Sequence, residues 1–446
     1  MKYAALALSL LFVVGCDEAP PTQAPAPSSA VPLAKAESAA KAAAADVGLC
    51  AGYVSDKLPR AMEVLPLPPK GVTFVDPAFG GRVTRITDVD PAEGENAIIK
   101  PMYSTIQAWS PFESYLILWH RGVGWELYNG ETYEFLEVLD LQSPSDIEHV
   151  LWDPWDERYL YYPSNWNLLQ RIMRHNVETN VSEVWMDLDA MGLCAAGTAS
   201  VSLGGDPSGA SFMLPGLAVA SMHCGNRYMF VELKHKVVSD LLSVEPPPGR
   251  LVPFIAPYGQ VAFLPTYGTH TVDVLFNIRR PLGAFLGNGH EHGSIGTART
   301  AMDAWYSVVF DPPLGLQPAT LQRLDLNTGT VKVIVGEANG WPYPPSGTHI
   351  SAMSRDLGRV AVSMVGDPAV AIAGTAPLHQ EIVLANSDTG EVCRVAHHRS
   401  AAGSGSTGWG YWGEPHLGLS PTGNRIVFGS DWHKGSAVNT FVVDLR

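Results

Sequence analysis

The chain has 446 residues and a formal net charge of −15, from 29 basic and 44 acidic side chains. This acidic balance argues against a nucleic acid partner, because nucleic acid-binding proteins carry basic faces. The 46% of apolar residues suffice for a buried core, whereas 16% charged residues, 43 Gly and 35 Pro are typical of a turn-rich protein. The length fits two domains or one closed array of repeats.

Residues 1–16 predict a bacterial lipoprotein signal and its lipidation site. Lys2 supplies a basic start, residues 4–14 form an apolar run too short to span a bilayer, and Cys16 ends it. We expect cleavage before Cys16 and lipidation of its thiol; an ordinary secretory signal is the alternative. The protein is then held at the bacterial cell envelope by its lipid alone, on a periplasm-facing membrane or at the cell surface.

Residues 17–48 are rich in Ala and Pro and contain no core-forming run, which predicts a disordered linker. Residues 49–446 are then expected to form one domain, which we predict to be monomeric.

Four cysteines follow the lipidation site: Cys50, Cys194, Cys224 and Cys393. An exported chain meets an oxidising compartment, so up to two disulfides are expected, in three possible connectivities. The Cys194–Cys224 pair is favoured, because these residues are close enough in sequence to lie on neighbouring strands. No CxxC motif is present, which argues against a zinc knuckle or a thioredoxin-type site.

From residue 71 onward, short apolar runs are separated by Gly, Pro, Asn and Asp, which is typical of an all-β protein. A strand–turn–strand unit recurs near residues 106, 149, 349 and 416, and hairpins with a Thr-Gly turn follow at 321–334 and 381–395. Two hairpins make a four-stranded blade. A further clear start lies near 292, and weaker ones lie near 202 and 258, so that we predict a seven-bladed β-propeller of four-stranded antiparallel blades. Residues 72–88 are expected to supply the outer strand that closes the ring on the last blade.

The two ends of this region resemble the ends of oligogalacturonate lyases. The matching segments are residues 76–87 (DPAFGGRVTRIT) and 415–431 (PHLGLSPTGNRIVFGSD), and the resemblance spans residues 72–446. It implies a seven-bladed propeller, related in repeat style to TolB-type propellers. It also implies a divalent cation, typically manganese, held at the axial end by several His and a Gln.

The resemblance assigns the metal ligands to the last two blades. One family ligand falls on His349, and the family His-Pro-His falls on Glu414, Pro415 and His416, so that one imidazole is replaced by a carboxylate. The family Gln falls on Tyr411, which is a poor ligand. The chain departs from the family pattern at these two positions.

The resemblance also places the catalytic base, a His that removes the C5 proton of a uronate. It falls on His292 or His290. The assisting Arg of the family falls near Leu275, so Arg279 or Arg280 would have to take its place.

The residues themselves support a metal centre. Residues that begin the innermost strand of each blade converge on the axis of a propeller, so His292, His349 and His416 are expected to meet there. Imidazoles with one carboxylate suit manganese, zinc or iron, and calcium is a further option. The alternative for His149, His349 and His416 is a structural role, in which each hydrogen-bonds the neighbouring blade.

Aromatic residues complete the expected site. Tyr411, Tyr267 or Tyr258 would protonate the leaving oxygen. Trp409 and Trp412 are candidates for stacking against a sugar, although packing between blades is the favoured interpretation.

The sequence therefore predicts metal-assisted β-elimination of an acidic, uronate-containing oligosaccharide. One alternative is a non-catalytic propeller that binds an envelope protein or a glycan, as TolB-type propellers do. Another is hydrolysis by a metal-bound water.

Overall fold

Antiparallel β-strands dominate the chain, as the short apolar runs predict. The computed structural model describes residues 48–164, 171–192, 201–205, 217–222, 227–238, 242–243, 254–256, 261–264, 270–273, 278–281, 293–310, 317–401, 410–433 and 435–446. Leu49–Arg446 form one unit, and its boundary lies where the linker is predicted to end. Within the described ranges, no helix is long and apolar enough to cross a membrane.

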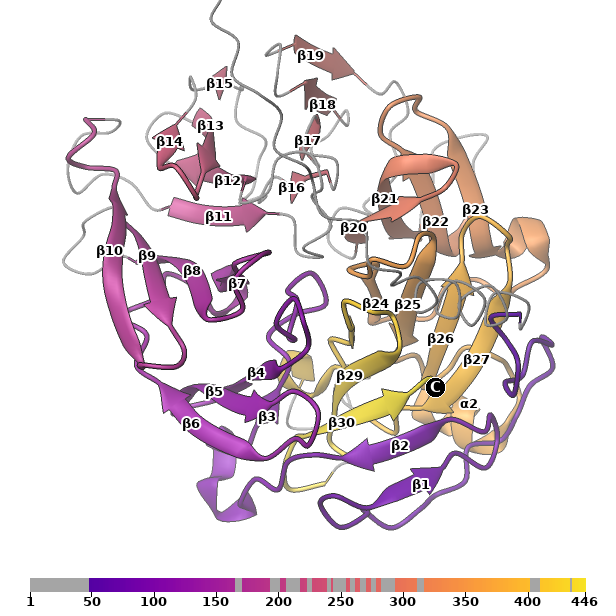
Figure 1. The fold of residues 1–446 in the computed structure, drawn as a ribbon. Coiled ribbons are helices and arrows are strands. Elements are labelled where there is room, and N and C mark those ends of the chain that lie inside the picture. The colour runs from indigo at the N-terminus through magenta and orange to yellow at the C-terminus, as the bar shows by residue number, and fades with distance from the viewer. Residues whose placement is uncertain are drawn as a thin grey trace, which may run out of the picture. The chain divides into compact units, whose positions relative to one another are not determined.

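The strands form seven antiparallel sheets, of which five have four strands in chain order (Figure 1). The first two contain β3 (Ile99–Lys100), β4 (Tyr115–His120), β5 (Gly124–Asn129) and β6 (Phe135–Leu139), and β7 (Leu151–Trp152), β8 (Tyr159–Ser164), β9 (Arg171–Asn176) and β10 (Val181–Asp187). The third contains β16 (Phe254–Ile255), β17 (Val261–Leu264), β18 (His270–Asp273) and β19 (Ile278–Pro281). The last two contain β20 (Gly293–Ala298), β21 (Ala301–Val309), β22 (Ala319–Asp325) and β23 (Val331–Gly336), and β24 (Thr348–Ser351), β25 (Arg359–Met364), β26 (Glu381–Asn386) and β27 (Val392–His397).

The other two sheets have five strands each, which differs from the four-stranded blades predicted throughout. One contains β11 (Val201–Gly205), β12 (Leu217–Met222), β13 (Arg227–Glu232), β14 (Val237–Val238) and β15 (Leu242–Ser243). The other contains β1 (Thr73–Val75), β2 (Arg82–Arg85), β28 (Gly418–Leu419), β29 (Arg425–Ser430) and β30 (Asn439–Asp444). The described helices are short: η2 (Pro91–Asn96), η3 (Ile147–His149), η5 (Glu337–Asn339), α2 (Pro368–Ala373) and η6 (Gly410–Gly413).

Consecutive sheets contact one another around a ring, and the last contacts the first through β30 and β3. The predicted propeller with four-stranded antiparallel blades is therefore confirmed in outline. Strands inside a blade are buried on both faces because each face packs against a neighbouring blade. In β29, for example, all six residues are buried, and Phe428 stacks on Phe441 of β30 with ring centroids 5.5 Å apart.

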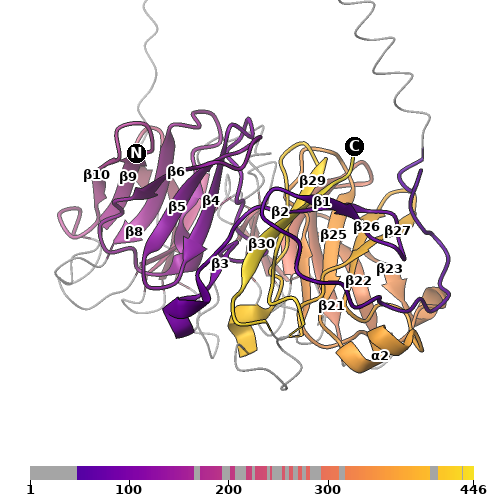
Figure 2. The ribbon, with the colours of Figure 1, turned by 90° about the horizontal axis from the view of Figure 1, so that it is seen from below.

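The ring is closed by strands from both ends of the chain, as predicted for residues 72–88. Strand β2 pairs with β30 through Arg82 opposite Asp444 and Arg85 opposite Phe441, and β1 adds to the outer side of β2. Figure 2 shows β1 and β2 beside β30. This pairing covers the sheet edge that an open ring would expose.

Local sequence explains the outer hairpins at 321–334 and 381–395. Each turn begins with a side chain that accepts backbone hydrogen bonds: Asp325 Oδ1 accepts from the amide of Asn327 at 2.8 Å, and Asn386 Oδ1 accepts from that of Asp388 at 2.9 Å. Each turn ends with a glycine of positive φ, 75° at Gly329 and 85° at Gly390. Such a φ favours glycine, which explains the Thr-Gly signature.

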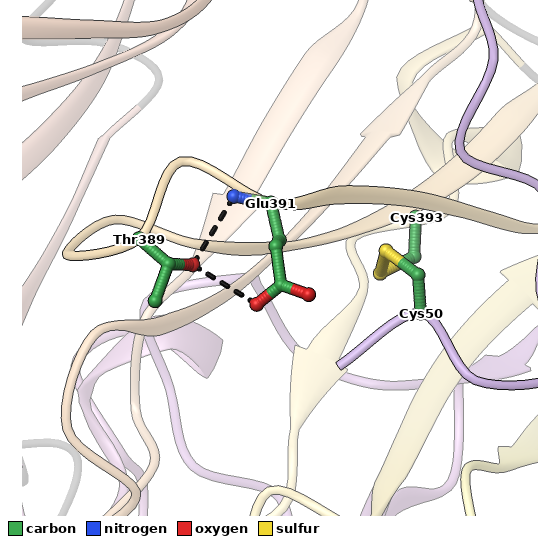
Figure 3. Close-up of a disulfide and its surroundings, with 4 residues drawn as sticks. All are labelled: Cys50, Thr389, Glu391 and Cys393. Atoms are coloured by element: carbon green, nitrogen blue, oxygen red, sulfur yellow. Dashed lines mark hydrogen bonds between the residues drawn. A yellow bond between two sulfur atoms is a disulfide. The ribbon is translucent and has the colours of Figure 1, made fainter. Parts of the chain in front are cut away.

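A disulfide joins Cys50 to Cys393 across 343 residues (Figure 3). Cys393 lies in β27, so the bond fixes the start of the domain to the outer strand of the β24–β27 sheet. The favoured pair Cys194–Cys224 lies outside the described residues. Of the three connectivities left open by the sequence, only the one that includes Cys194–Cys224 is compatible with this bond.

Removing this disulfide is expected to destabilise the protein. The double variant Cys50→Ser/Cys393→Ser should lose about 2–4 kcal/mol of unfolding free energy, because the unfolded chain regains the freedom that the cross-link restricts. Differential scanning calorimetry would then give a lower Tm than wild type. A reductant should lower the Tm of wild type more than that of the double variant, in which the expected Cys194–Cys224 bond is the one left to reduce; equal Tm values without reductant would contradict this prediction.

Candidate metal centre

Two histidines and one glutamate from neighbouring blades meet at the start of the inner strands. His349 is the second residue of β24 and is fully buried. His416 precedes β28 with a φ of 42°, an unusual conformation for a residue with a side chain. Glu414 follows η6, and its amide donates to the carbonyl of Tyr411 at 3.1 Å. The η6 turn and the strained residue after Pro415 thus direct Glu414 and His416 towards β24.

The three side chains are close enough to share one ion. Their candidate ligand atoms all lie within 4.8 Å of one another. Glu414 Oε2 is 3.4 Å from His349 Nε2 and 3.6 Å from His416 Nε2. The structure therefore brings together His349, Glu414 and His416, the three residues predicted as metal ligands.

Two tyrosines surround these imidazoles. The Tyr103 ring centroid lies 5.5 Å from that of His349 and 4.8 Å from that of His416, both edge-on. Tyr411 packs on His416 at 4.6 Å, and its hydroxyl donates to Glu148 Oε1 at 2.6 Å. Tyr411 is thus beside the cluster, as its alignment with a family ligand position suggests, and it is 41% exposed.

The sequence analysis missed Lys100, Tyr103 and Glu148. Lys100 ends β3, is 1% exposed, and donates from Nζ to the carbonyls of Glu414 at 2.6 Å and Trp412 at 3.2 Å. Glu148 lies in η3, just before β7. Four different sheets therefore contribute side chains to one region, which places this region at the axis of the ring. What these residues share is a position in or next to the innermost strand of their sheet, and this position is the signal that could have identified them.

Burial dominates the electrostatics around the cluster. It lowers the pKa of Lys100 to about 7, although the carboxylates of Glu414 and Glu148 act in the opposite direction. It raises the pKa of Glu414 against the influence of Lys100, and that of Glu148 against its hydrogen bond from Tyr411. Partial burial, followed by the charge of Glu148, raises the pKa of Tyr411. The phenol therefore keeps its proton at neutral pH.

The donor set fits a divalent transition metal. Two imidazoles and a carboxylate are a common ligand set for manganese, zinc or iron, whereas calcium prefers an all-oxygen shell. The chemistry of the residues thus favours the first three of the four metals predicted. The buried, partly aromatic surroundings restrict water at this position and strengthen electrostatic interactions there.

Other predicted residues contribute no ligand to the cluster. Trp412 stacks on Trp119 with ring centroids 4.9 Å apart, and Arg121 lies over the Trp412 ring, which favours packing over sugar stacking for this residue. Arg279 and Arg280 lie on β19, the strand farthest from the inner strand β16 of its sheet. The backbone thus places both arginines at the outer edge of a blade, and Lys100 is the cation that the described residues bring to the axis.

The predicted bases His290 and His292 lie outside the described residues, as do Trp409, Tyr258 and Tyr267. His149, at the end of η3, is next to Glu148, and burial lowers its pKa. Burial therefore favours the neutral imidazole at this position.

The comparisons with known proteins concern the fold. No family model matches the chain, and no curated protein matches its sequence. An oligogalacturonate lyase solved in complex with manganese is 14% identical, with a TM-score of 0.56 over 85% of this chain and 97% of that chain. The oligogalacturonate lyase from Vibrio parahaemolyticus is also 14% identical, with a TM-score of 0.55 over 84% and 98%. At this identity the likeness shows the fold, a β-propeller like that of oligogalacturonate lyases.

Proposed function

We propose that this chain is an envelope lipoprotein that cleaves an acidic, uronate-containing oligosaccharide by metal-assisted β-elimination. All seven sheets act as blades of one ring around its axial site. The observation that supports this proposal is the convergence of His349, Glu414 and His416 with ligand atoms within 4.8 Å. The fold shared with an oligogalacturonate lyase that is solved with manganese supports the choice of reaction and ion.

The roles of the residues follow from their positions. His349, Glu414 and His416 would hold a divalent ion, preferably manganese. Such an ion polarises a bound uronate carboxylate and so acidifies the C5 proton. His292 or His290 removes this proton as general base. The C4–O bond breaks as the C4–C5 double bond forms, and Tyr411 donates a proton to the departing oxygen.

Lys100 takes the charge-stabilising role first assigned to Arg279 or Arg280. Its Nζ lies 2.6 Å from the carbonyl of Glu414, within the same buried region as the ligand cluster. A cation there would attract the uronate carboxylate through a medium that screens charge weakly. The net charge of −15 describes the whole chain and does not prevent a local cationic pocket of this kind.

The decisive experiment follows the ultraviolet absorbance of a polygalacturonate solution with the purified, manganese-loaded protein. β-Elimination produces an unsaturated uronate and a rise in absorbance. New reducing ends without this rise would indicate hydrolysis by a metal-bound water instead. A metal-free protein that is inert on a panel of polyuronates would favour the non-catalytic alternative, a platform for a glycan or an envelope protein.

Substituting Tyr411 by phenylalanine tests the general acid. We expect kcat to fall by about 10²–10⁴-fold, because the leaving oxygen loses its proton donor. Bound metal should stay unchanged, since the phenyl ring keeps its packing on His416. Tyr343→Phe, at an exposed tyrosine, is the matched control and should keep full activity. An unchanged kcat in Tyr411→Phe would move the acid role to Tyr258, Tyr267 or Tyr103.

Anchoring is a separate part of the proposal. Lipid attached to Cys16 would hold the catalytic domain at the envelope through the linker at residues 17–48. The variant Cys16→Ser should move the protein from the membrane fraction to the soluble periplasmic fraction. Continued membrane association of Cys16→Ser would show that something other than this lipid retains the protein.

A further inference from the structure

A groove lies at the end of the β7–β10 sheet and has a cavity volume of about 280 Å³. Its lining combines aromatic and charged side chains, among them Asp153, Trp155, Tyr159, Tyr161, Arg174 and Trp185. We call it the Trp155 groove. This mixture of aromatic surface and polar groups differs from the apolar packing between the blades.

The Trp155 groove and the candidate metal centre lie on opposite faces of the ring. His349 is near the start of its inner strand β24, whereas Asp153 follows the end of the inner strand β7. Blades in one ring share the direction of their inner strands, so the starts of these strands lie on one face and their ends on the other. The groove is therefore a second feature and not an extension of the axial site.

A hydrogen-bonded turn presents the tryptophan. Asp153 Oδ1 accepts from the amides of Trp155 at 2.9 Å and Asp156 at 3.0 Å. Its other oxygen, Oδ2, accepts from the Tyr161 hydroxyl at 3.2 Å. This turn fixes the backbone while the Trp155 side chain remains 47% exposed. The turn thus holds the large Trp155 side chain at the surface of the protein.

The rings of Tyr159 and Trp185 in the groove are already covered by cations, and Tyr161 is buried. The Arg174 guanidinium lies 4.4 Å from the Tyr159 ring centroid and 3.7 Å from that of Trp185. Lys236 Nζ lies 3.9 Å from the same Trp185 centroid. These cations disfavour a cationic ligand, which would compete for the same rings and be repelled. Trp155 is the lining aromatic that offers exposed ring surface to a ligand.

The charges that line the groove balance. Asp153 and Asp156 oppose Arg174 and Lys234, and Arg174 is further paired with Glu183. No net charge is therefore available to select an anion or a cation. Carboxylate and guanidinium groups do, however, hydrogen-bond strongly to neighbouring hydroxyls, and an exposed indole accepts the apolar C–H face of a sugar ring.

We propose that the Trp155 groove binds a neutral pyranose unit of an oligosaccharide, with the sugar ring against Trp155 and its hydroxyls on Asp153. This site would let the protein hold a glycan on the face opposite its axial centre. The inference does not depend on lyase activity at that centre, because it uses none of the same residues.

The preceding blade supplies a matched control. Phe112 occupies the position of Trp155 in the equivalent turn of the repeat, Ser-Pro-Phe-Glu against Asp-Pro-Trp-Asp, and it is 60% exposed. It does not line the Trp155 groove. Phe112→Ala therefore tests the loss of an exposed aromatic side chain outside the groove. Trp155→Ala tests the loss of the exposed aromatic side chain that lines the groove.

Isothermal titration calorimetry of the full domain in excess chelator would measure binding without a contribution from bound metal. The probes are cellotetraose, maltotetraose and mannotetraose as neutral ligands, and trigalacturonate as an acidic one. We expect at least one neutral tetrasaccharide to bind, and Trp155→Ala to weaken that binding by about tenfold or more. Trp155→Phe, which keeps an aromatic ring, should lose less, and Phe112→Ala should bind like wild type.

Several results would overturn the proposal. One is that none of the neutral probes binds to wild type. Another is equal affinity in Trp155→Ala and wild type, which would place the glycan elsewhere. A third is binding of trigalacturonate alone, which would show that the ligand is selected by its charge. Because Trp155 is exposed, Trp155→Ala should keep the Tm of wild type, so that a loss of binding is not explained by unfolding.

Discussion

Replacing both His349 and His416 by alanine is expected to reduce bound divalent metal from about one ion per chain to none, because only one of three ligands remains. Cleavage of polyuronates should disappear with the metal. Inductively coupled plasma mass spectrometry of the purified protein measures the first result, and the ultraviolet assay measures the second. Manganese added back should restore neither in the double variant, but should restore both in chelator-treated wild type.

Both imidazoles are buried, so the double variant also leaves two cavities and loses stability. Glu414→Gln avoids this problem, since it keeps the shape of a side chain that is 16% exposed and removes only its charge. We expect it to weaken metal binding by at least tenfold with an unchanged Tm. His175→Ala is the matched control: His175 is equally buried but bonds to Ser182 in the β9–β10 hairpin. Full metal content in His349→Ala/His416→Ala would place the ion elsewhere in the chain.

Repeats in the sequence predicted the propeller because each blade is encoded locally. Most strands pair with the next strand along the chain, and turn-forming residues lie between them. Asp325 and Gly329, for example, indicate a hairpin from the local sequence alone. The unit starts predicted near 292 and 350 lie beside β20 and β24. Even the long-range pairing of β2 with β30 was predictable, since a ring that leaves two open edges is unfavourable.

The metal cluster was predictable for the same reason. Its ligands are residue types that bind metals, and they lie at equivalent places in their blades, where the ring geometry converges. Lys100 lies in the innermost strand of its sheet and Glu148 lies just before that of the next, but a lysine or a glutamate at such a position looks like an ordinary surface residue in sequence. Their burial comes from the packing of four blades around the axis, which no local pattern records.

Distance along the chain was a poor guide to what lies close in space. Proximity in sequence favoured Cys194–Cys224, which lies outside the described residues, and gave no sign of the disulfide that joins Cys50 to Cys393. That bond follows from the closed ring, which brings the start of the domain beside its last blades. Arg279 and Arg280 were chosen because they are near Leu275 in sequence. Strands β16, β17 and β18 lie between these arginines and the axis, because β19 is at the outer edge of its sheet.

Asp76→Asn is expected to destabilise the domain by about 3–5 kcal/mol, because it leaves a buried arginine without its counter-charge. Asp76 Oδ2 accepts from Arg399 Nη1 at 2.8 Å and from the His397 amide at 3.1 Å. Arg399 and Asp76 are both almost fully buried. Asp76 also lies between β1 and β2, where the ring closes. Denaturation in guanidinium chloride should show a lower midpoint, and an unchanged midpoint would mean that the pair contributes nothing.

The pair Arg85–Asp88 is the control, because its arginine is also buried but its carboxylate is not: Arg85 is 8% exposed and Asp88 is 64% exposed. Since water screens the exposed carboxylate, Asp88→Asn should cost less than about 1 kcal/mol. The effect of Asp76 also depends on pH in a defined direction. Burial would raise its pKa, but the hydrogen bond from His397 and the charges of Arg399 and His397 prevail and lower it to about 2. A carboxyl whose pKa is lower in the folded state stabilises that state above its ordinary value of 3.8. The stability difference between wild type and Asp76→Asn should therefore be constant at neutral pH and shrink as the pH falls from about 4 towards 2.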